Sequence, residues 1–244
     1  MNLDVATISI LGIPVHPFTM DGAVTALDKA IINRQQAFVV TANAEIIMMA
    51  QEDGAYQKIL TEIADVVLPD GAGTVWAGRH LGYTVPERVA GYDLFQRLLA
   101  LAAAKGYKVY FFGGTPGIAE VAAQRSAEQY PGLQVVGTRN GYFTEQEVPE
   151  IIAEINASGA ELLFVALGAP KQEIWLAEHG QKLQAAVRMG IGGSFDVVAG
   201  KMQRAPLWMQ NAGLEWLFRL YKQPGRFVRM LALPKFVIKV WMSK

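Results

Sequence analysis

Polar residues that could do chemistry follow two apolar stretches of the chain. Thr41 and Asn43 come directly after the first stretch, and Asp70 opens a Pro-Asp-Gly turn after the second. A carboxylate placed in this way can accept a proton from a hydroxyl group, and hydroxyl and amide side chains can bind a polar ligand. Asn and Asp are also common first residues of helices. Spacing alone therefore does not decide whether Asn43 and Asp70 cap helices or belong to a site.

Two glycine-containing segments could bind a phosphorylated nucleotide. In the stretch FFGGTPG, glycines stand between an apolar run and a helical pattern, so backbone N–H groups near Gly114 and Thr115 can approach a phosphate. In NGYF, Asn140 offers an amide and Tyr142 a ring on which a base can stack, although Asn-Gly is also a routine turn. The glycines lack the GxGxxG spacing of dinucleotide-binding folds, which disfavours an NAD site.

Cationic residues at two more places could face the same ligand. Arg88 lies in the stretch VPERVAG, where it either pairs with an acid of the protein or binds a sugar diphosphate. Pro170 follows an apolar run and starts a helix. The first turn of that helix holds Lys171, Gln172 and Glu173. A lysine there is unfavourable against the helix dipole unless an anion is near, so the segment favours a phosphate ligand over a solvated helix start.

Residue types that bind metals are scattered along the chain. The three histidines lack any ligand spacing, and the chain has neither cysteine nor an Asp-x-Asp pair. A nucleotide-sugar enzyme that uses Mg²⁺ or Mn²⁺ normally needs paired carboxylates. We therefore expect no metal and no cofactor. A leaving diphosphate would have to be stabilised by cationic side chains and helix N–H groups.

A repeated pattern of apolar run and amphipathic segment must position these residues. Nearly continuous apolar strands predict a parallel sheet covered on both faces, whose ligands bind at the carboxyl ends of the strands. We predict an α/β, doubly wound Rossmann-like fold, with Thr144 and Glu147 as a capping box and Pro116 and Pro170 in first helical turns. Beyond a strand and turn at 8–15, the expected strands are 37–41, 65–69, 107–112, 133–137, 161–167 and 186–191, and the expected helices lie near 44–63, 72–80, 92–105, 116–129, 145–158 and 172–182.

The two parts of the chain differ in charge. Residues 1–200 have a net charge of −8, whereas residues 201–244 hold nine Lys and Arg and one acid, a net charge of +8. The acidic part disfavours nucleic-acid binding. A basic segment rich in Trp, Phe, Leu and Met indicates an anionic membrane surface.

We therefore predict a catalytic body (1–195) and a short basic helical appendage (196–244) that docks on the membrane and completes the site. Pro224 and Pro234 should divide this appendage into short helices, and no window has the ~18 apolar residues of a spanning helix. The alternative is that the segment packs against the body as a capping element.

Motifs spread over nearly the whole chain combine into a more specific signal: TANAE (41–45), LPDG (68–71), RVAGYDL (88–94), FFGG (111–114), NGYF (140–143), GAPKQE (168–173), GIGGSFDVVAGKMQRAP (190–206) and GLEWLFRL (213–220). Together they resemble the WecG/TagA/CpsF glycosyltransferases of bacterial surface polysaccharide synthesis.

The resemblance implies an inverting, metal-independent hexosyltransferase of the N-acetylmannosaminyltransferase type. It would transfer N-acetylmannosamine from UDP to the 4-hydroxyl of N-acetylglucosamine on undecaprenyl diphosphate, in wall teichoic acid or related polysaccharide synthesis. The implied partners are the UDP-sugar, the lipid-linked acceptor and an anionic membrane surface. The implied location is cytoplasmic, on the inner face of the cell membrane. A homo-oligomer is possible, and the sequence does not decide the oligomeric state.

The resemblance also implies roles for residues that match the motifs of the family. Asp70 is then the general base. The residues expected to line the sugar and diphosphate pocket are Thr41, Asn43, Arg88 and Gln172, completed from the tail by Arg219, Arg226 and Arg229. Asp196, in the GSFD motif, either contacts the nucleotide or caps the turn into the tail.

Other functions stay open on the residues themselves. The chain could be a nucleotide-binding oxidoreductase or a non-catalytic peripheral membrane module. A thermal-shift comparison of UDP with NAD separates transferase from oxidoreductase, because the cognate ligand stabilises the folded state by mass action. Turnover excludes the membrane module. Family members that use another UDP-hexose, or the uronic acid of N-acetylmannosamine, would share the same phosphate-binding residues.

Overall fold

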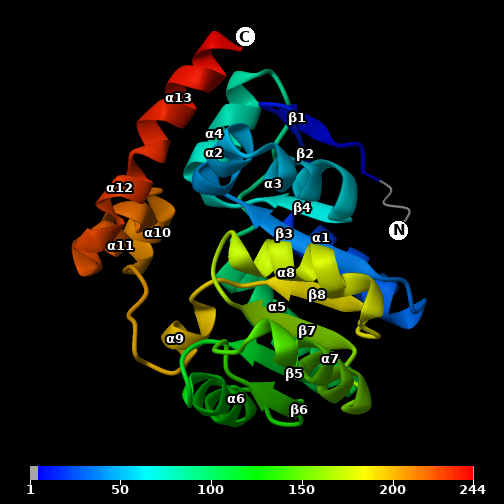
Figure 1. Ribbon diagram of the computed structural model, residues 1–244. Coiled ribbons are helices and arrows are strands. Elements are labelled where there is room, and N and C mark those ends of the chain that lie inside the picture. Colours follow the sequence, from blue (N-terminus) through cyan, green and yellow to red (C-terminus); the bar gives the residue numbers. More distant parts are fainter. Residues whose placement is uncertain (1–4, 244) are drawn as a thin grey trace.

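A parallel sheet forms the centre of the molecule (Figure 1). The computed structural model describes residues 5–243, and its six-stranded sheet has the order β4-β3-β8-β7-β5-β6. All paired neighbours in this sheet run parallel, which confirms the predicted doubly wound, Rossmann-like α/β fold. Its strands are β3 (Ala37–Ala42), β4 (Val66–Pro69), β5 (Lys108–Gly113), β6 (Gln134–Arg139), β7 (Leu162–Ala166) and β8 (Val187–Gly190).

Helices cover both faces of the sheet. One face packs against α2 (Ala44–Glu52), α3 (Gly54–Lys58), α4 (Gly71–His80), α7 (Val148–Ala157) and α8 (Lys171–His179), and against a hairpin of β1 (Ile8–Ile10) and β2 (Ile13–Val15). The other face packs against α1 (Met20–Ile32), α5 (Gly91–Lys105), α6 (Ile118–Gln129) and α9 (Ser194–Val198). Because both faces are covered, a strand such as β7 is buried at every residue.

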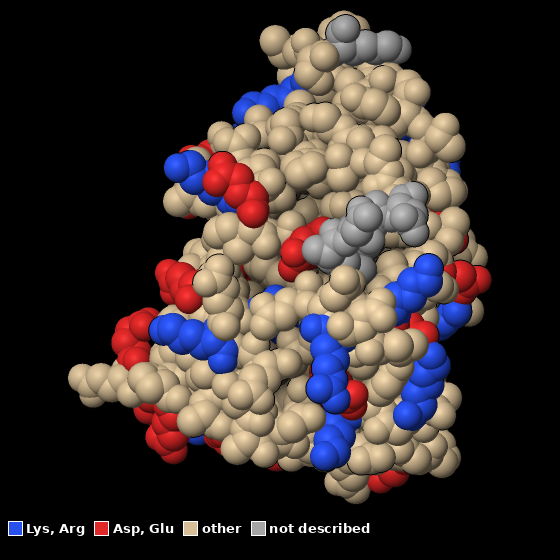
Figure 2. All heavy atoms as spheres, turned by 90° about the vertical axis from the view of Figure 1, so that its right-hand side faces the viewer, with Lys and Arg blue, Asp and Glu red and all other residues tan. Residues whose placement is uncertain are grey.

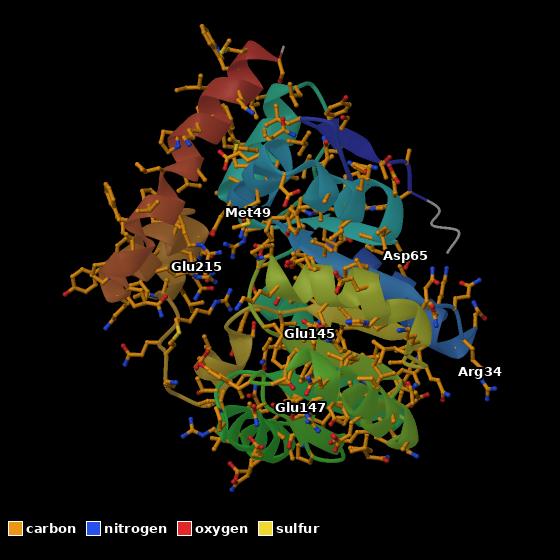
Figure 3. All side chains as sticks on the ribbon, viewed as in Figure 1. Arg34, Met49, Asp65, Glu145, Glu147 and Glu215 are labelled. Carbon is orange, nitrogen blue, oxygen red and sulfur yellow. The ribbon has the colours of Figure 1, made fainter. Side chains whose placement is uncertain are left out.

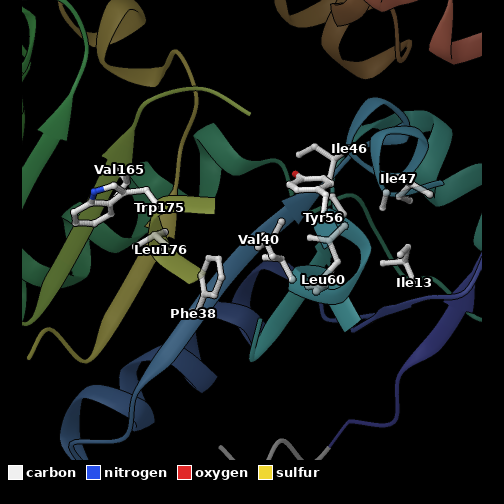
Figure 4. Close-up of a cluster of buried hydrophobic side chains, with 14 of the residues drawn as sticks. Ile13, Phe38, Val40, Ile46, Ile47, Tyr56, Leu60, Val165, Trp175 and Leu176 are labelled. Atoms are coloured by element: carbon white, nitrogen blue, oxygen red, sulfur yellow. The ribbon is translucent and has the colours of Figure 1, made fainter. Parts of the chain in front are cut away.

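Side chains along β3 alternate between these two faces. Phe38 and Val40 pack with Tyr56 and Leu60 on the face that the hairpin covers (Figure 4), whereas Val39 lies in the core of the other face. Burying side chains of this size contributes about 1.5–3 kcal/mol each. The packing fixes the carboxyl ends of the strands, where the candidate site residues follow.

The predicted capping box is confirmed, whereas both prolines expected in first helical turns lie outside their helices: Pro170 is the N-cap residue before α8, which begins at Lys171. Thr144 and Glu147 form the capping box, with mutual hydrogen bonds, and Asn43 caps α2 by accepting from Ile46 N. Pro116 does not enter the first turn of α6. The glycines on either side of it, Gly114 and Gly117, have φ of +74° and +86°, so the chain turns there and the helix begins at residue 118.

The helix expected at 44–63 is divided. Helix α2 ends at Glu52, and the Asp53 carboxylate then accepts hydrogen bonds from the backbone N–H groups of Ala55 and Tyr56. These bonds cap a new helix, α3, which continues as a π-helical turn to Ile63. The sequence pattern missed this break because Asp53-Gly54 is flanked on both sides by residues with helical spacing.

The basic C-terminal segment forms short helices, as predicted: α10 (Leu207–Asn211), α11 (Glu215–Lys222), α12 (Phe227–Met230) and α13 (Ala232–Met242). Pro224 lies between α11 and α12 as expected, but Pro234 is inside the first turn of α13 and does not divide the segment, because proline is tolerated in a first helical turn. Helix α13 lies beside α2 and α4 (Figure 1), and the side chains of Phe236 and Val240 are fully buried in the core. Part of the predicted appendage is thus a core element. The division at residue 195 falls inside α9 and stays a prediction.

The apolar length of the helices and the distribution of surface charge bear on membrane binding. In the part of the chain that the structure describes, no helix is long and apolar enough to cross a bilayer. Figure 2 shows the face turned away from α10–α12, where acidic and basic side chains are interspersed rather than gathered by sign.

Candidate active site

Asp70 lies at the carboxyl end of β4, beside β3. Its backbone N–H donates to Ala42 O at 3.1 Å, and the hydroxyl of Thr74 donates to the same oxygen at 3.0 Å. The side chain of Asp70 does not cap α4. Its Oδ2 accepts instead from Gly91 N at 3.3 Å. The capping interpretation is therefore correct for Asn43 but wrong for Asp70, whose carboxylate remains available for a ligand.

The segment after α4 brings Arg88 to the same strand end. Arg79 holds this segment by donating to Val85 O and Pro86 O, and Val89 N donates to Pro69 O at 2.9 Å. The next helix, α5, then starts directly against β3. A Cβ on Gly91 would lie 2.6 Å from Thr41 Oγ1, so only glycine allows this approach. Thr41, Asp70 and the backbone beside Arg88 are thereby brought together.

Ion pairs join this part of the body to the C-terminal segment. Arg88 contacts Glu215 at 3.3 Å and Asp93 at 3.9 Å. Glu215 also contacts Arg219 at 2.9 Å and Arg204 at 3.6 Å. Arg204 makes a bidentate pair with Asp93, at 2.5 and 2.8 Å. Three arginines and two acids thus form one network near Asp70.

Sequence reasoning proposed Arg88 and Arg219 for this site but missed Asp93, Arg204 and Glu215. Each ion pair between body and tail joins residues more than a hundred positions apart, for example Arg88 with Glu215. No local pattern reveals such partners. One signal was present: Glu215 is the only acidic residue among 201–244.

The protonation of Asp70 reflects two opposing effects. Burial raises the pKa of Asp70 above the ordinary value of a carboxyl group, and the charge of Arg219, the N–H group of Gly91 and the charge of Arg88 oppose this rise. The pKa remains raised. A carboxylate whose pKa is raised toward neutrality is a stronger base than an ordinary aspartate and is suited to take a proton from a hydroxyl group.

The residues of the GAPKQE motif separate in space. Pro170 precedes the first turn of α8, and Lys171 is exposed there, whereas Gln172 and Glu173 are buried. Gln172 Oε1 accepts from Gly192 N at 2.9 Å, and its Nε2 donates to Glu173 Oε1 at 2.7 Å. All three residues are in the first turn of α8, as expected, but only Lys171 is exposed to a phosphate ligand, because successive helical residues point about 100° apart.

Glu173 is buried and therefore does not face a ligand directly. It orients Gln172 through their hydrogen bond. Burial raises the pKa of Glu173, and the hydrogen bond from Gln172 opposes this rise only in part. A Cβ on Gly190 would lie 2.6 Å from Gln172 Nε2, so the amide fits closely against the end of β8. The Gln172 amide has a second N–H donor beside the one that bonds to Glu173.

Backbone contacts build the other end of the site, where β5 and β7 diverge in their connections. Gly113 has φ of +124°, and a Cβ on it would lie 2.5 Å from the backbone of Ala166. Gly114 N donates to Ala166 O at 3.0 Å, and Gly141 N donates to Gly114 O at 2.8 Å. The loops after β5, β6 and β7 are thus packed backbone to backbone at the switch point of the sheet, where ligands of such folds bind.

Side chains around this switch point are polar and accessible. Asn140 Oδ1 accepts from Tyr142 N at 2.9 Å, and the Tyr142 ring is 70% exposed. Lys201 donates to the Thr115 hydroxyl at 3.2 Å and lies 3.7 Å from Asp196. Asp196 is inside α9, where it pairs with this lysine and does not serve as a side-chain cap.

The remaining predicted arginines come from the short helices of the tail. Arg229 pairs with Glu45 at the start of α2 and donates to Ala169 O at 3.3 Å, so it joins the first turn of α2 to the loop after β7. The side chain of Arg226 lies outside the described part of the structure.

The predicted residues therefore form two groups along one edge of the sheet. Thr41, Asp70 and Arg88 lie at β3 and β4, whereas Thr115 and Asn140 follow β5 and β6. Three strand spacings separate β3 from β5, which corresponds to about 14 Å. Among residues 5–243, no three His, Asp or Glu side chains are grouped as metal ligands would be. The edge has the length and polarity to hold an extended nucleotide-sugar.

Comparison with known proteins agrees with this geometry. The family model described as "Glycosyl transferase WecG/TagA/CpsF family" matches residues 8–244. A protein of Bacillus spizizenii strain W23, named N-acetylglucosaminyldiphosphoundecaprenol N-acetyl-beta-D-mannosaminyltransferase, is 39% identical over 84% of this chain and 78% of its own length. A protein of the same name from Bacillus subtilis strain 168 is 32% identical over 96% of this chain and 91% of its own length. Both the match over the whole α/β body and the similarity of these relatives show that the chain belongs to the WecG/TagA/CpsF family of glycosyltransferases.

Proposed function

We propose that the protein transfers N-acetylmannosamine from UDP to the 4-hydroxyl of N-acetylglucosamine on undecaprenyl diphosphate, with inversion at the anomeric carbon. The names of the two relatives support this donor and acceptor. The observation that carries the proposal is Asp70, a carboxyl group with a raised pKa beside the arginines of the network. The lipid-linked disaccharide product would be used to build a wall polymer such as teichoic acid.

The transfer is a single displacement in this proposal. The acceptor 4-hydroxyl attacks the anomeric carbon from the side opposite UDP while its proton passes to Asp70. The bond from the anomeric carbon to the diphosphate oxygen breaks, and UDP leaves with its electron pair. Arg88 and Arg219 neutralise the charge that develops on the diphosphate. One base and a set of cations are sufficient for this chemistry.

The nucleotide would occupy the β5–β6 end of the site. The N–H of Gly114 is bonded to Ala166 O, so the N–H of Thr115 is the group of this loop that would approach a phosphate, and the exposed ring of Tyr142 can stack on uracil. Asn43, Gln172 and the Pro170–Lys171 turn would line the sugar and diphosphate pocket between the nucleoside and Asp70, with Glu173 orienting Gln172. Arg226, Arg229 and Asp196 would close the site from the tail.

The acceptor lipid requires a membrane surface, and the tail offers the matching chemistry. Its helices expose large apolar side chains beside Lys and Arg, and each such cation near an anionic surface contributes about 1 kcal/mol. The protein would thus bind peripherally to the cytoplasmic face of the membrane. The exposed apolar residues are Leu207, Trp208, Trp216, Leu217, Tyr221, Phe227, Val228, Leu231, Val237, Ile238, Trp241 and Met242.

A donor screen tests the proposed reaction. Purified protein is incubated with UDP-N-acetylmannosamine, its uronic acid or UDP-glucose and with a short-chain lipid-diphosphate-N-acetylglucosamine acceptor. Mass and linkage of the product are then determined. A β-1,4 disaccharide formed with UDP-N-acetylmannosamine is the expected product. Preferential use of another UDP-hexose would keep the reaction class and replace the sugar, whereas no transfer from any of the donors would contradict the proposal.

Vesicle sedimentation tests the membrane part separately. The protein should sediment with phosphatidylglycerol vesicles at low salt and be released at high salt, because exposed charges are screened. A variant with Trp208→Ser and Trp241→Ser should sediment less, and both side chains are exposed, so the fold should persist. Equal sedimentation with uncharged vesicles would contradict an electrostatic surface.

A further inference from the structure

Glu215 is an exception in its surroundings. It is the only acid among 201–244, a segment with nine Lys and Arg, and it stands at the start of α11. Its side chain is only 12% exposed. Figure 3 shows Glu215 where the tail helices face the body, among nitrogen-bearing side chains. A lone carboxylate placed inward in a basic segment points to a specific task.

The contacts of Glu215 connect three arginines from different parts of the chain. Arg88 comes from the body, Arg219 is one turn further along α11, and Arg204 precedes α10. Each arginine has five N–H donors, and Glu215 occupies only one on Arg88 and one on Arg219. The arginines can therefore remain bound to Glu215 and still present free donors to an anion.

Burial distinguishes these contacts from ordinary surface ion pairs. The side chains of Arg88, Arg204 and Glu215 are 22%, 19% and 12% exposed. An exposed pair contributes little to stability, but removing one member of a partly buried network leaves the other charges uncompensated. Without Glu215, the three arginines would repel one another, and α11 would lose its contact with Arg88.

We propose that Glu215 is a positioning residue that holds Arg88 of the body and Arg219 of the tail together beside Asp70, so that both can bind the donor diphosphate. This inference deepens the proposed function and rests on it. Glu215 does not touch the reacting atoms in this account. It couples the docking of α11 to the assembly of the cationic pocket.

The charges around Asp70 let the proposal predict the direction in which the pKa of Asp70 changes when Glu215 is replaced. The groups that face Asp70 are Arg219, Arg88 and Glu215; Arg219 lowers the pKa of Asp70 more than Glu215 raises it. If Glu215 acted only through its own charge, Glu215→Gln would lower the pKa of Asp70. If it positions Arg219, the variant also releases the larger, opposing charge, and the pKa of Asp70 should rise.

The test compares Glu215→Gln with Glu52→Gln. Glu52 pairs with Lys235 at 3.6 Å and so also joins body and tail, but both side chains are more than 60% exposed and lie outside the network. Glu215→Gln should weaken binding of UDP, measured by calorimetry, and lower kcat/KM for the donor by about 10- to 100-fold, mainly through KM. Glu52→Gln should match the wild type, and Glu215→Asp should recover part of the loss. Thermal unfolding confirms that each variant is folded.

A double-mutant cycle separates positioning from a general structural role. In the background of Arg219→Gln, the change Glu215→Gln should cost much less than in the wild type, since its effect passes partly through Arg219. The acid limb of the kcat/KM profile should move to higher pH in Glu215→Gln. Additive losses, an acid limb at lower pH, or tighter UDP binding would overturn the proposal. Tighter binding would instead make Glu215 an internal competitor of the diphosphate.

The two proposals fail in different ways. If the wild type transfers no sugar in the donor screen, the proposed reaction is wrong, while UDP binding still reports on the arginines. If the wild type is active and Glu215→Gln behaves like Glu52→Gln in both turnover and UDP binding, the reaction stands and the role of Glu215 is wrong.

Discussion

The two ends of the candidate site differ in the groups that form them: charged side chains at one end and backbone contacts at the other. At the β3–β4 end, charged side chains of body and tail meet around Asp70, and most of them are paired. At the β5–β6 end, backbone contacts among Gly113, Gly114 and Gly141 shape the loops, and Tyr142 stays open to solvent. Chemistry needs fixed charges, whereas binding of a nucleotide needs close backbone approach and a stacking surface. We infer that the β3–β4 end serves bond formation and that the β5–β6 end serves binding of the nucleoside.

The largest expected effect is at the Asp70 end. Asp70→Asn keeps the shape of the side chain but removes the proton acceptor, so turnover should fall by roughly 10²–10⁴-fold. UDP binding should not weaken, because the arginines proposed to bind the diphosphate and the loops proposed to bind the base are left unchanged. Kinetics and calorimetry on the same preparation check both. Near-normal turnover would move the base to another residue.

The matching change at the other end is Tyr142→Ala. Loss of base stacking costs about 1–3 kcal/mol, so KM for the donor should rise by about 5- to 150-fold with little change in kcat. Tyr83→Ala is the control, since Tyr83 is also an exposed tyrosine but lies outside the site. A fall in kcat at saturating donor would show that the two ends do not divide the work as described.

Sequence reasoning succeeded where local patterns fix the structure. The strands were found because buried parallel strands are nearly continuous apolar runs, and Thr144 with Glu147 was recognised because a capping box has a fixed spacing. Asn43 and Asp70 were placed at neighbouring strand ends for the same reason.

What the sequence could not reveal depends on tertiary packing. The network around Glu215 joins residues distant along the chain, and the burial of Glu173 depends on how α8 packs on the sheet. The burial of Phe236 in the core also differs from the expected separate appendage. Amphipathic spacing showed a face but not which surface covers it.

Glu173 provides a smaller test that concerns stability. Because its folded-state pKa is raised, the folded protein binds more protons than the unfolded chain between the ordinary and the raised pKa. Stability should therefore fall as pH rises through this window, by at most about 1.4 kcal/mol per pH unit for one group. Glu173→Gln should reduce that slope in urea unfolding measured at several pH values. An unchanged slope would show that Glu173 is not the group responsible.

The smallest expected effect is that of metal removal. Arginines surround the Asp70 end, so the diphosphate charge can be neutralised by side chains. Turnover should therefore survive exhaustive treatment with EDTA. Loss of activity that Mg²⁺ or Mn²⁺ restores would mean that a cation, and not the arginine network, balances the leaving group.

The pH profile of kcat/KM tests the role of Asp70 most directly, in the wild type and in Asp70→Asn. A base whose pKa is raised by burial gives an activity that increases with pH through that raised pKa and then levels off. We predict this acid limb in the wild type, above the pH of about 4 at which an ordinary carboxyl titrates, and its absence from the residual activity of Asp70→Asn. The same limb in both proteins would contradict the assignment of Asp70 as the base.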